Sequence, residues 1–207
     1  MPKNHRRSIR LKGYDYTQPG AYFVTICTHG REILFGHVVD GEMALNEYGE
    51  IVREEWFRST EIRAEVELFH DEFVIMPNHI HGIVWIVETD NPSVVGAHGH
   101  VGAHGRAPLL PQRPPRSLGS FIAGFKSIVT KRINTLRNTP GAPVWQRNYY
   151  EHIIRNDRAL NAIRRYIAAN PACWHLDRYN PNATGRDPWT AEIDHVLRIT
   201  PSLKETP

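Results

Sequence analysis

The stretch Met76-Pro77-Asn78-His79-Ile80-His81-Gly82-Ile83-Val84-Trp85-Ile86 lies near the middle of the chain. Its β-branched run predicts a strand over residues 82–87, with the two histidines at the entrance of that strand. Alternate residues of a strand face the same side, so His79 and His81 point together while Ile80 points away. Two imidazoles on one face can form half of a metal site. The alternative is a strand edge with two solvated histidines, and the short pattern alone leaves both open.

Charge is unevenly distributed along the 207 residues, although the net charge is only +3. Residues 1–12 hold five lysines and arginines and no acid, and residues 113–165 hold eleven against two acids. Residues 40–72 hold eleven acids against three arginines. Two basic regions favour an anionic polymer as partner, with the acidic region facing elsewhere. The alternative is a set of solvated faces that happen to be segregated.

Hydrophobic periodicity predicts the order of the elements. Strands are expected over residues 22–28, 66–76, 82–87 and 144–154, and a short hairpin over 34–45 around Asp40-Gly41. Helices are expected from Asn46 to about residue 59, over 117–138, from Asn156 or Asp157 to Asn170, and over 190–198. This order predicts an α+β fold with a mostly antiparallel sheet, close to the ferredoxin-like split βαβ pattern.

The chain length predicts one domain with tails. We expect a basic N-terminal arm over residues 1–12, a domain over 13–171 and a C-terminal tail over 172–207. Residues 90–116 form a low-complexity insert with a near-exact Val-Gly-Ala-His-Gly repeat. We interpret this insert as a flexible loop, because a glycine-rich segment does not position metal ligands.

A second group of functional candidates lies near the end of the last long helix. Tyr166 and Asn170 are four residues apart and therefore share one helical face. Arg164 and Arg165 flank the tyrosine, so phosphate chemistry is one interpretation and a tyrosine that only packs is the other.

Taken together, these residues resemble a known family. Met-Pro-Asn-His79-Ile80-His81-Gly with Tyr166-x-x-x-Asn170-Pro171 resembles the single-tyrosine HUH transposases, specifically the IS200-like, REP-associated tyrosine transposases. The likeness covers roughly residues 13–171, including the stretch from Trp145 to His152.

The resemblance implies a nuclease that cuts single-stranded DNA near a hairpin and rejoins it through a 5′-phosphotyrosine. It implies Tyr166 as the nucleophile and His79, His81 and Asn170 as ligands of Mg²⁺ or Mn²⁺. Tyr149 and Tyr150 are rival nucleophiles, and as consecutive strand residues at most one of them can reach the site. The expected role is DNA transposition or the processing of REP-type repeats, by a homodimer or a monomer.

DNA binding should combine positive charge with base stacking. The candidate residues are basic and come from the arm, the long helix, the last strand and the tyrosine helix: Lys3, Arg6, Arg7, Arg10, Lys12, Lys126, Lys131, Arg132, Arg147 and Arg165.

No apolar run approaches the ~20 residues of a membrane span. The basic N-terminus also lacks the hydrophobic core of a secretory signal. We therefore expect no membrane partner and a cytoplasmic, nucleoid-associated protein.

Two other functions remain open. A hairpin-binding protein derived from a transposase would bind DNA without cutting it. A small-molecule metallohydrolase with a His-x-His pair typically needs a barrel of ~250 residues with repeated strand–helix units. This chain is shorter and lacks that repeat.

Overall fold

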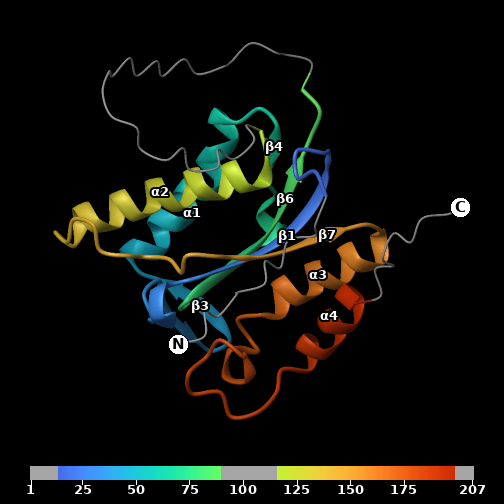
Figure 1. Ribbon diagram of the computed structural model, residues 1–207. Helices are drawn as coiled ribbons and strands as arrows, with labels where there is room; N and C mark the ends of the chain where they lie inside the picture. Colours follow the sequence, from blue (N-terminus) through green and yellow to red (C-terminus); the bar gives the residue numbers. More distant parts are fainter. Residues whose placement is uncertain (1–13, 90–115, 199–207) are drawn as a thin grey trace, which may run out of the picture.

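A five-stranded antiparallel sheet lies at the centre of the computed structural model, which describes residues 14–89 and 116–198 (Figure 1). Strands β1 (Gly20–Cys27) and β6 (His79–Ile86) form its central pair. Strand β7 (Tyr150–Ile154) pairs with the other side of β1. Strands β4 (Val66–Glu67) and β5 (Phe73–Met76) pair with opposite ends of β6.

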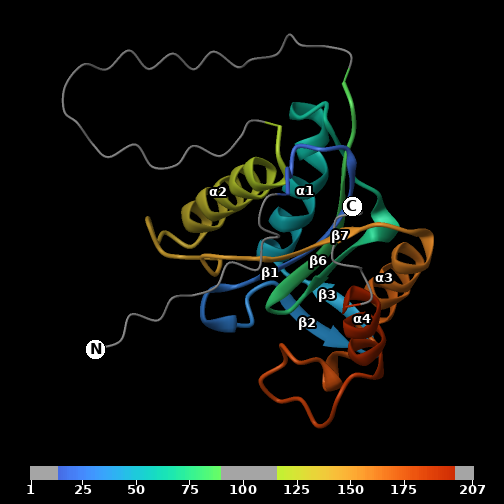
Figure 2. The same ribbon diagram turned by 45° about the vertical axis from the view of Figure 1, so that its right-hand side comes forward.

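Helices cover both faces of this sheet, as Figures 1 and 2 show. Helices α1 (Glu47–Ile62) and α2 (Leu118–Leu136) pack on one face. Helices α3 (Asp157–Ala169) and α4 (Pro188–Arg198) lie on the other. The strand order and the crossovers through α1 and α2 confirm the ferredoxin-like split βαβ prediction.

Alternation along the central strands separates two hydrophobic cores. Tyr22, Val24 and Ile26 of β1 pack toward α1 and α2. Ala21 and Phe23 pack toward α3. Because side chains of a strand alternate between faces, each core receives every second residue of β1 and β6.

The helix starts agree with the sequence signals. Asn46 caps α1 by accepting hydrogen bonds from two backbone N–H groups. Ser117 and Ser120 form a reciprocal capping box at the start of α2, and Asn156 caps α3. Strands β2 (Gly36–Val39) and β3 (Glu42–Leu45) form the predicted hairpin. Its two turn residues, Asp40 and Gly41, have φ of 51° and 81°.

Two predicted strands are shorter than expected. The stretch 66–76 is split into β4 and β5 by the 3₁₀ turn η2 (His70–Glu72). This turn places the buried Glu72 carboxylate where it accepts a hydrogen bond from the Trp85 indole. Of the stretch 144–154, only residues 150–154 are strand, because Lys126 binds the carbonyl oxygens of Gln146 and Arg147.

The segment after Pro171 is part of the folded structure. It contains the turn η3 (Trp174–Leu176) and then α4, whose Ile193 is buried against α3.

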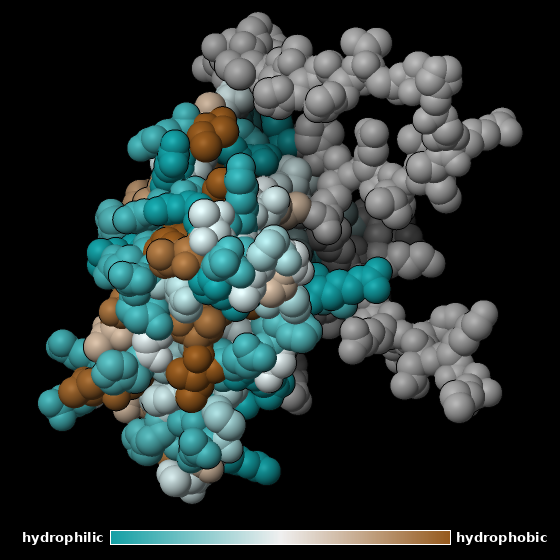
Figure 3. Space-filling view, turned by 90° about the vertical axis from the view of Figure 1, so that its left-hand side faces the viewer, coloured by the Kyte–Doolittle hydropathy of each residue, from teal (hydrophilic) through white to brown (hydrophobic). Residues whose placement is uncertain are grey.

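The basic arm and nearly all of the predicted insert lie outside the described residues. Every helix within residues 14–89 and 116–198 is too short or too polar to span a lipid bilayer. The face seen in Figure 3 is mostly hydrophilic, with hydrophobic residues in separate patches.

Candidate active site

His79 and His81 lie at the end of β6 that pairs with the last residues of β1. Both side chains are fully buried, with 0% exposure. Their Nε2 atoms are 3.0 Å apart, and their ring centroids are 4.6 Å apart. The alternative of two solvated histidines is therefore wrong.

Asn78 orients the first histidine. Its Nδ2 donates to the backbone oxygens of Arg31 at 3.2 Å and of Tyr179 at 2.7 Å. Its Oδ1 therefore faces His79 Nδ1, at 2.9 Å. Because a carbonyl oxygen only accepts, His79 carries its proton on Nδ1 and presents Nε2 as a lone pair.

Thr25 orients the second histidine from the neighbouring strand. Its hydroxyl lies 2.8 Å from His81 Nδ1. Since a hydroxyl both donates and accepts, Thr25 fits either tautomer of His81, including the one that presents Nε2 as a second lone pair. Hydrogen bonds to the ring nitrogen that does not bind the metal fix the orientation of metal-binding histidines.

Helix α3 brings the tyrosine and the amide to these histidines. The Tyr166 hydroxyl lies 3.2 Å from His81 Nε2, and its ring packs edge-on against Phe23. Asn170 follows one turn later at the C-cap of α3 and is 1% exposed. Neither Oδ1 nor Nδ2 of Asn170 has a hydrogen-bond partner in the described part of the chain.

The loop after α3 adds two residues that the sequence patterns did not single out. Asp177 Oδ2 lies 3.8 Å from His79 Nε2, and one ligand atom from each of His79, His81 and Asp177 lies within 4.8 Å of the others. Asp177 Oδ1 accepts a 2.6 Å hydrogen bond from the Tyr179 N–H. The Tyr179 ring lies 4.6 Å from the His79 ring. The only sequence signal for them was a carboxylate and an aromatic residue in a turn-rich stretch.

Burial sets the protonation states of the cluster. It lowers the pKa of His79 to about 3 and that of His81 well below its usual range, and the charge of Arg178 adds to both effects. Both rings are therefore neutral at pH 7. Burial raises the pKa of Asp177 to about 6, although the Tyr179 N–H opposes this shift. The pKa of Tyr166 is also raised, first by burial and then by the nearby Asp177.

The donor set fits a divalent cation. Among residues 14–89 and 116–198, Asp177 Oδ2 and the Asn170 side chain are buried without a hydrogen-bond partner, and Asn170 lies close enough to lower the pKa of Asp177. A buried polar atom without a partner costs about 1–3 kcal/mol, which a bound cation would recover. Imidazole nitrogen together with carboxylate and amide oxygen suits Mn²⁺, and Mg²⁺ accepts the oxygen ligands.

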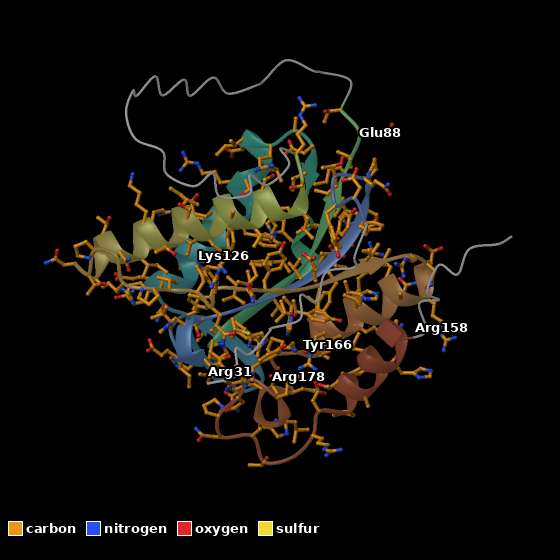
Figure 4. The ribbon with its side chains drawn as sticks, in the orientation of Figure 1. Arg31, Glu88, Lys126, Arg158, Tyr166 and Arg178 are labelled. Atoms are coloured by element: carbon orange, nitrogen blue, oxygen red, sulfur yellow. The ribbon has the colours of Figure 1, made fainter. Side chains whose placement is uncertain are left out.

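Most of the predicted basic residues are not brought to this cluster. Lys126, Lys131 and Arg132 belong to α2, which packs on the other face of the sheet. Arg132 forms ion pairs with Glu54 and Glu55. Figure 4 shows Lys126 and Tyr166 on different sides of the sheet. Arg147 is exposed in the loop before β7.

The two arginines beside Tyr166 are bound to carboxylates. Arg164 donates to the buried carboxylate of Glu72, and Arg165 pairs with Glu192 of α4 at 3.0 Å. The described chain instead places the charges of Arg31 and Arg178 within reach of His79. The predicted residues Lys3, Arg6, Arg7, Arg10 and Lys12 lie outside the described residues.

Comparison with solved structures identifies the fold. A REP-associated tyrosine transposase, solved bound to a REP hairpin, superimposes with a TM-score of 0.51 at 18% identity. The match covers 79% of this chain and 73% of that structure. The fold is therefore that of a REP-associated tyrosine transposase, which confirms the resemblance at the level of the fold.

Comparison with curated sequences identifies a relative. The chain is 42% identical over 176 residues to an uncharacterized protein of Haemophilus influenzae. The alignment spans 84% of this chain and 93% of the relative. The chain belongs to the same family as this Haemophilus influenzae protein. No protein-family model matches the chain.

Proposed function

We propose that this protein is a metal-dependent single-stranded DNA endonuclease and strand transferase that uses Tyr166 as its nucleophile. The observation that carries the proposal is the Tyr166 hydroxyl 3.2 Å from His81 Nε2, inside a buried cluster with His79 and Asp177. A tyrosine that only packs does not require its hydroxyl to lie beside a buried histidine that belongs to a His-His-Asp cluster. The transposase fold supports the same activity.

The chemical step is a phosphoryl transfer to the phenol oxygen. Tyr166 Oη forms a bond to phosphorus while the bond from phosphorus to the 3′ oxygen breaks. The phenol loses its proton and the departing 3′ oxygen gains one, which leaves a 5′-phosphotyrosine and a free 3′-hydroxyl. The free energy of the broken phosphodiester bond is conserved in the phosphotyrosine bond, so rejoining the strand needs no external energy source.

His79, His81, Asn170 and Asp177 would hold the divalent ion. When bound, Mg²⁺ or Mn²⁺ supplies positive charge to the scissile phosphate and lowers the barrier to attack. Two neutral imidazoles and an amide preserve the charge of the ion, whereas the Asp177 carboxylate reduces it by one. The pKa of Tyr166 is raised in the protein alone, so the phenol is protonated at pH 7.

Hairpin-forming single-stranded DNA is the substrate that we propose. The solved transposase with this fold is bound to a REP hairpin. DNA transposition or the processing of REP-type repeats is the corresponding role. The basic arm and Arg147 remain proposed contacts to the strand.

The test is formation of a covalent adduct. Single strands from the DNA flanking the gene, chosen for hairpin potential and labelled at the 3′ end, are incubated with protein and Mn²⁺, Mg²⁺ or EDTA. We expect a labelled protein band with either cation and none with EDTA. Tyr166→Phe and His81→Ala should abolish it, whereas Tyr48→Phe on α1 should not.

Two results would contradict the proposal. If Tyr166→Phe still forms the adduct, another nucleophile acts. If hairpin strands bind but are not cut with either cation, the protein is a non-catalytic hairpin-binding protein.

A further inference from the structure

A groove lies between α1 and α2 on the side of the two helices that faces solvent. The helices lie side by side on one face of the sheet (Figures 1 and 2). The groove has a volume of about 670 Å³, which is large enough to accept several side chains. Its apolar lining comes from Ile51, which is nearly buried, and from Ile128 and Leu136, which are 37% and 50% exposed. An apolar groove with charged residues around it is typical of a protein-binding surface.

The charges around the groove are separated by sign. The α1 side is acidic and the α2 side is basic, through Glu47, Glu50 and Glu54 on α1 and Lys131 and Arg132 on α2. Within α1, Glu50 pairs with Arg53, and across the groove Glu54 pairs with Arg132. Lys131 is exposed and forms no ion pair with another residue of the ranges 14–89 and 116–198. The groove therefore has an acidic side, a basic side and an apolar lining between them.

The two helices are antiparallel, which determines the residues that lie at the same level. Arg63, just after the end of α1, donates to the Ser120 hydroxyl in the first turn of α2. Arg132, in the second half of α2, binds Oε2 of Glu54 at 2.7 Å. Lys131 precedes Arg132 and therefore lies at about the level of Glu54. The Glu54 side chain is 57% exposed, so its carboxylate can accept a second cation.

We propose that this groove is the interface between two copies of this protein, in which α1 of each copy lies on α2 of the other. A two-fold axis parallel to the helices produces this arrangement and joins the same surface of both copies. Lys131 of each copy then faces Glu54 of the other, and the apolar lining of both grooves is removed from water. A two-fold axis across the helices would instead place α1 on α1, and repulsion between the acidic sides disfavours that arrangement.

Charge complementarity favours a second copy over other occupants of the groove. A uniformly basic or uniformly acidic partner would match one side of the groove and be repelled by the other. A second copy, turned about the axis described above, matches both sides at once. The interface lies on the face of the sheet opposite Tyr166, so this inference does not depend on the proposed function.

Sedimentation velocity of the full chain over a wide range of concentrations measures this association. We expect the wild type to change from monomer to dimer as its concentration rises. Lys131→Glu and Glu54→Lys each place two pairs of like charges in the dimer, so each should raise the dissociation constant at least about 10-fold. Arg158→Glu is the control, because it makes the same change of charge at an exposed position of α3 (Figure 4). It should leave the dissociation constant unchanged.

A mixture of the two variants tests the geometry of the interface. In a dimer of one Lys131→Glu chain with one Glu54→Lys chain, both facing pairs are again opposite in charge. One pair joins the two substituted positions, and the other joins the two native residues. We therefore expect the mixture to form dimers at concentrations where each variant alone is monomeric. Circular dichroism checks that each variant is folded, because Glu54→Lys also removes the ion pair with Arg132.

Three results would overturn the proposed interface. The first is a wild type that is monomeric at every concentration, which would leave the groove to another segment of this chain or to another protein. The second is a dimer that Lys131→Glu does not weaken. The third is a mixture of folded variants that stays monomeric where the wild type forms dimers.

Discussion

Asn78 links the metal-binding candidates to the loops around them. It is fully buried and satisfies three groups, the Nδ1 of His79 and the carbonyls of Arg31 and Tyr179. The sequence drew attention to the histidines, but it did not show that the asparagine before them selects the tautomer. That role depends on two carbonyls that lie 47 and 101 residues away along the chain.

Asn78→Ala should therefore weaken metal binding. Without the hydrogen bond to Asn78 Oδ1, the His79 ring can rotate and change its tautomer. Loss of such a hydrogen bond to a metal-binding histidine lowers the metal affinity about 10- to 100-fold. Isothermal titration of the metal-free protein with Mn²⁺ measures the change. Asn161→Ala, at an exposed position of α3, is the control. Equal affinities for Asn78→Ala and wild type would show that Asn78 does not act through His79.

Asp177 should make metal binding depend on pH. Its pKa is raised to about 6, so the carboxylate is ionised above pH 6 and protonated below it. A proton then competes with the cation, and Mn²⁺ affinity should fall about tenfold per pH unit below 6. His79 does not add to this loss until about pH 3.

The matched variant for this pH effect is Asp177→Asn, which cannot titrate. Its Mn²⁺ affinity should be lower at pH 7.5 and nearly flat between pH 7 and pH 5. A wild-type profile as flat as that of the variant would remove Asp177 from the ligand set.

At the level of the elements, strand β6 packs closely against helix α1 at Gly82. A Cβ at Gly82 would lie 2.6 Å from Cζ2 of Trp56, whose ring is fully buried and stacks on Phe73 at 4.5 Å. The glycine therefore lets a large ring of α1 lie flat against the strand that carries the histidines.

Gly82→Ala should lower the free energy of unfolding by about 1–3 kcal/mol, because neither the strand nor the stacked ring can move aside. Urea denaturation measures this loss. Gly124→Ala on α2 is the matched control, because nothing lies within 4 Å of the added Cβ. It should leave stability unchanged or raise it by up to about 1 kcal/mol. A neutral Gly82→Ala would contradict the packing described for Trp56.

Periodicity and capping residues were enough to predict α1, α2, α3 and the β2–β3 hairpin, because local signals specify them. The split of residues 66–76 was not predictable, because it depends on Glu72 accepting hydrogen bonds from Trp85 and Arg164. Asp177 was not predicted because its position, too, depends on contacts between distant parts of the chain. Its place beside His79 is set by the packing of the loop after α3, for which the sequence carries no periodic signal.

At the scale of the whole molecule, the candidate site lies where four segments meet at one end of the sheet. β6 brings the histidines, α3 brings Tyr166, the loop after α3 brings Asp177, and the turn after β1 brings Arg31. One face of the sheet builds the larger core with α1 and α2, and the other holds the polar cluster. The larger core is thus separate from the residues proposed to act on DNA, whereas Tyr166 is also part of the smaller core on the other face.

The proposed function requires that Tyr166 becomes covalently linked to DNA. Tyr149, Tyr150 and Tyr179 are the rivals, and the structure places the Tyr179 ring 4.6 Å from His79. Trypsin cleaves after Arg165 and Arg178, so Tyr166 falls in the peptide 166–178 and Tyr179 in the peptide 179–186. Tyr149 and Tyr150 share a third peptide, 148–155.

The most direct measurement is mass spectrometry of the adduct formed with a hairpin strand and Mn²⁺, after digestion by trypsin and nuclease. We expect a nucleotide attached through phosphate to Tyr166 in the peptide 166–178. A nucleotide on the peptide 148–155 or 179–186 would contradict it.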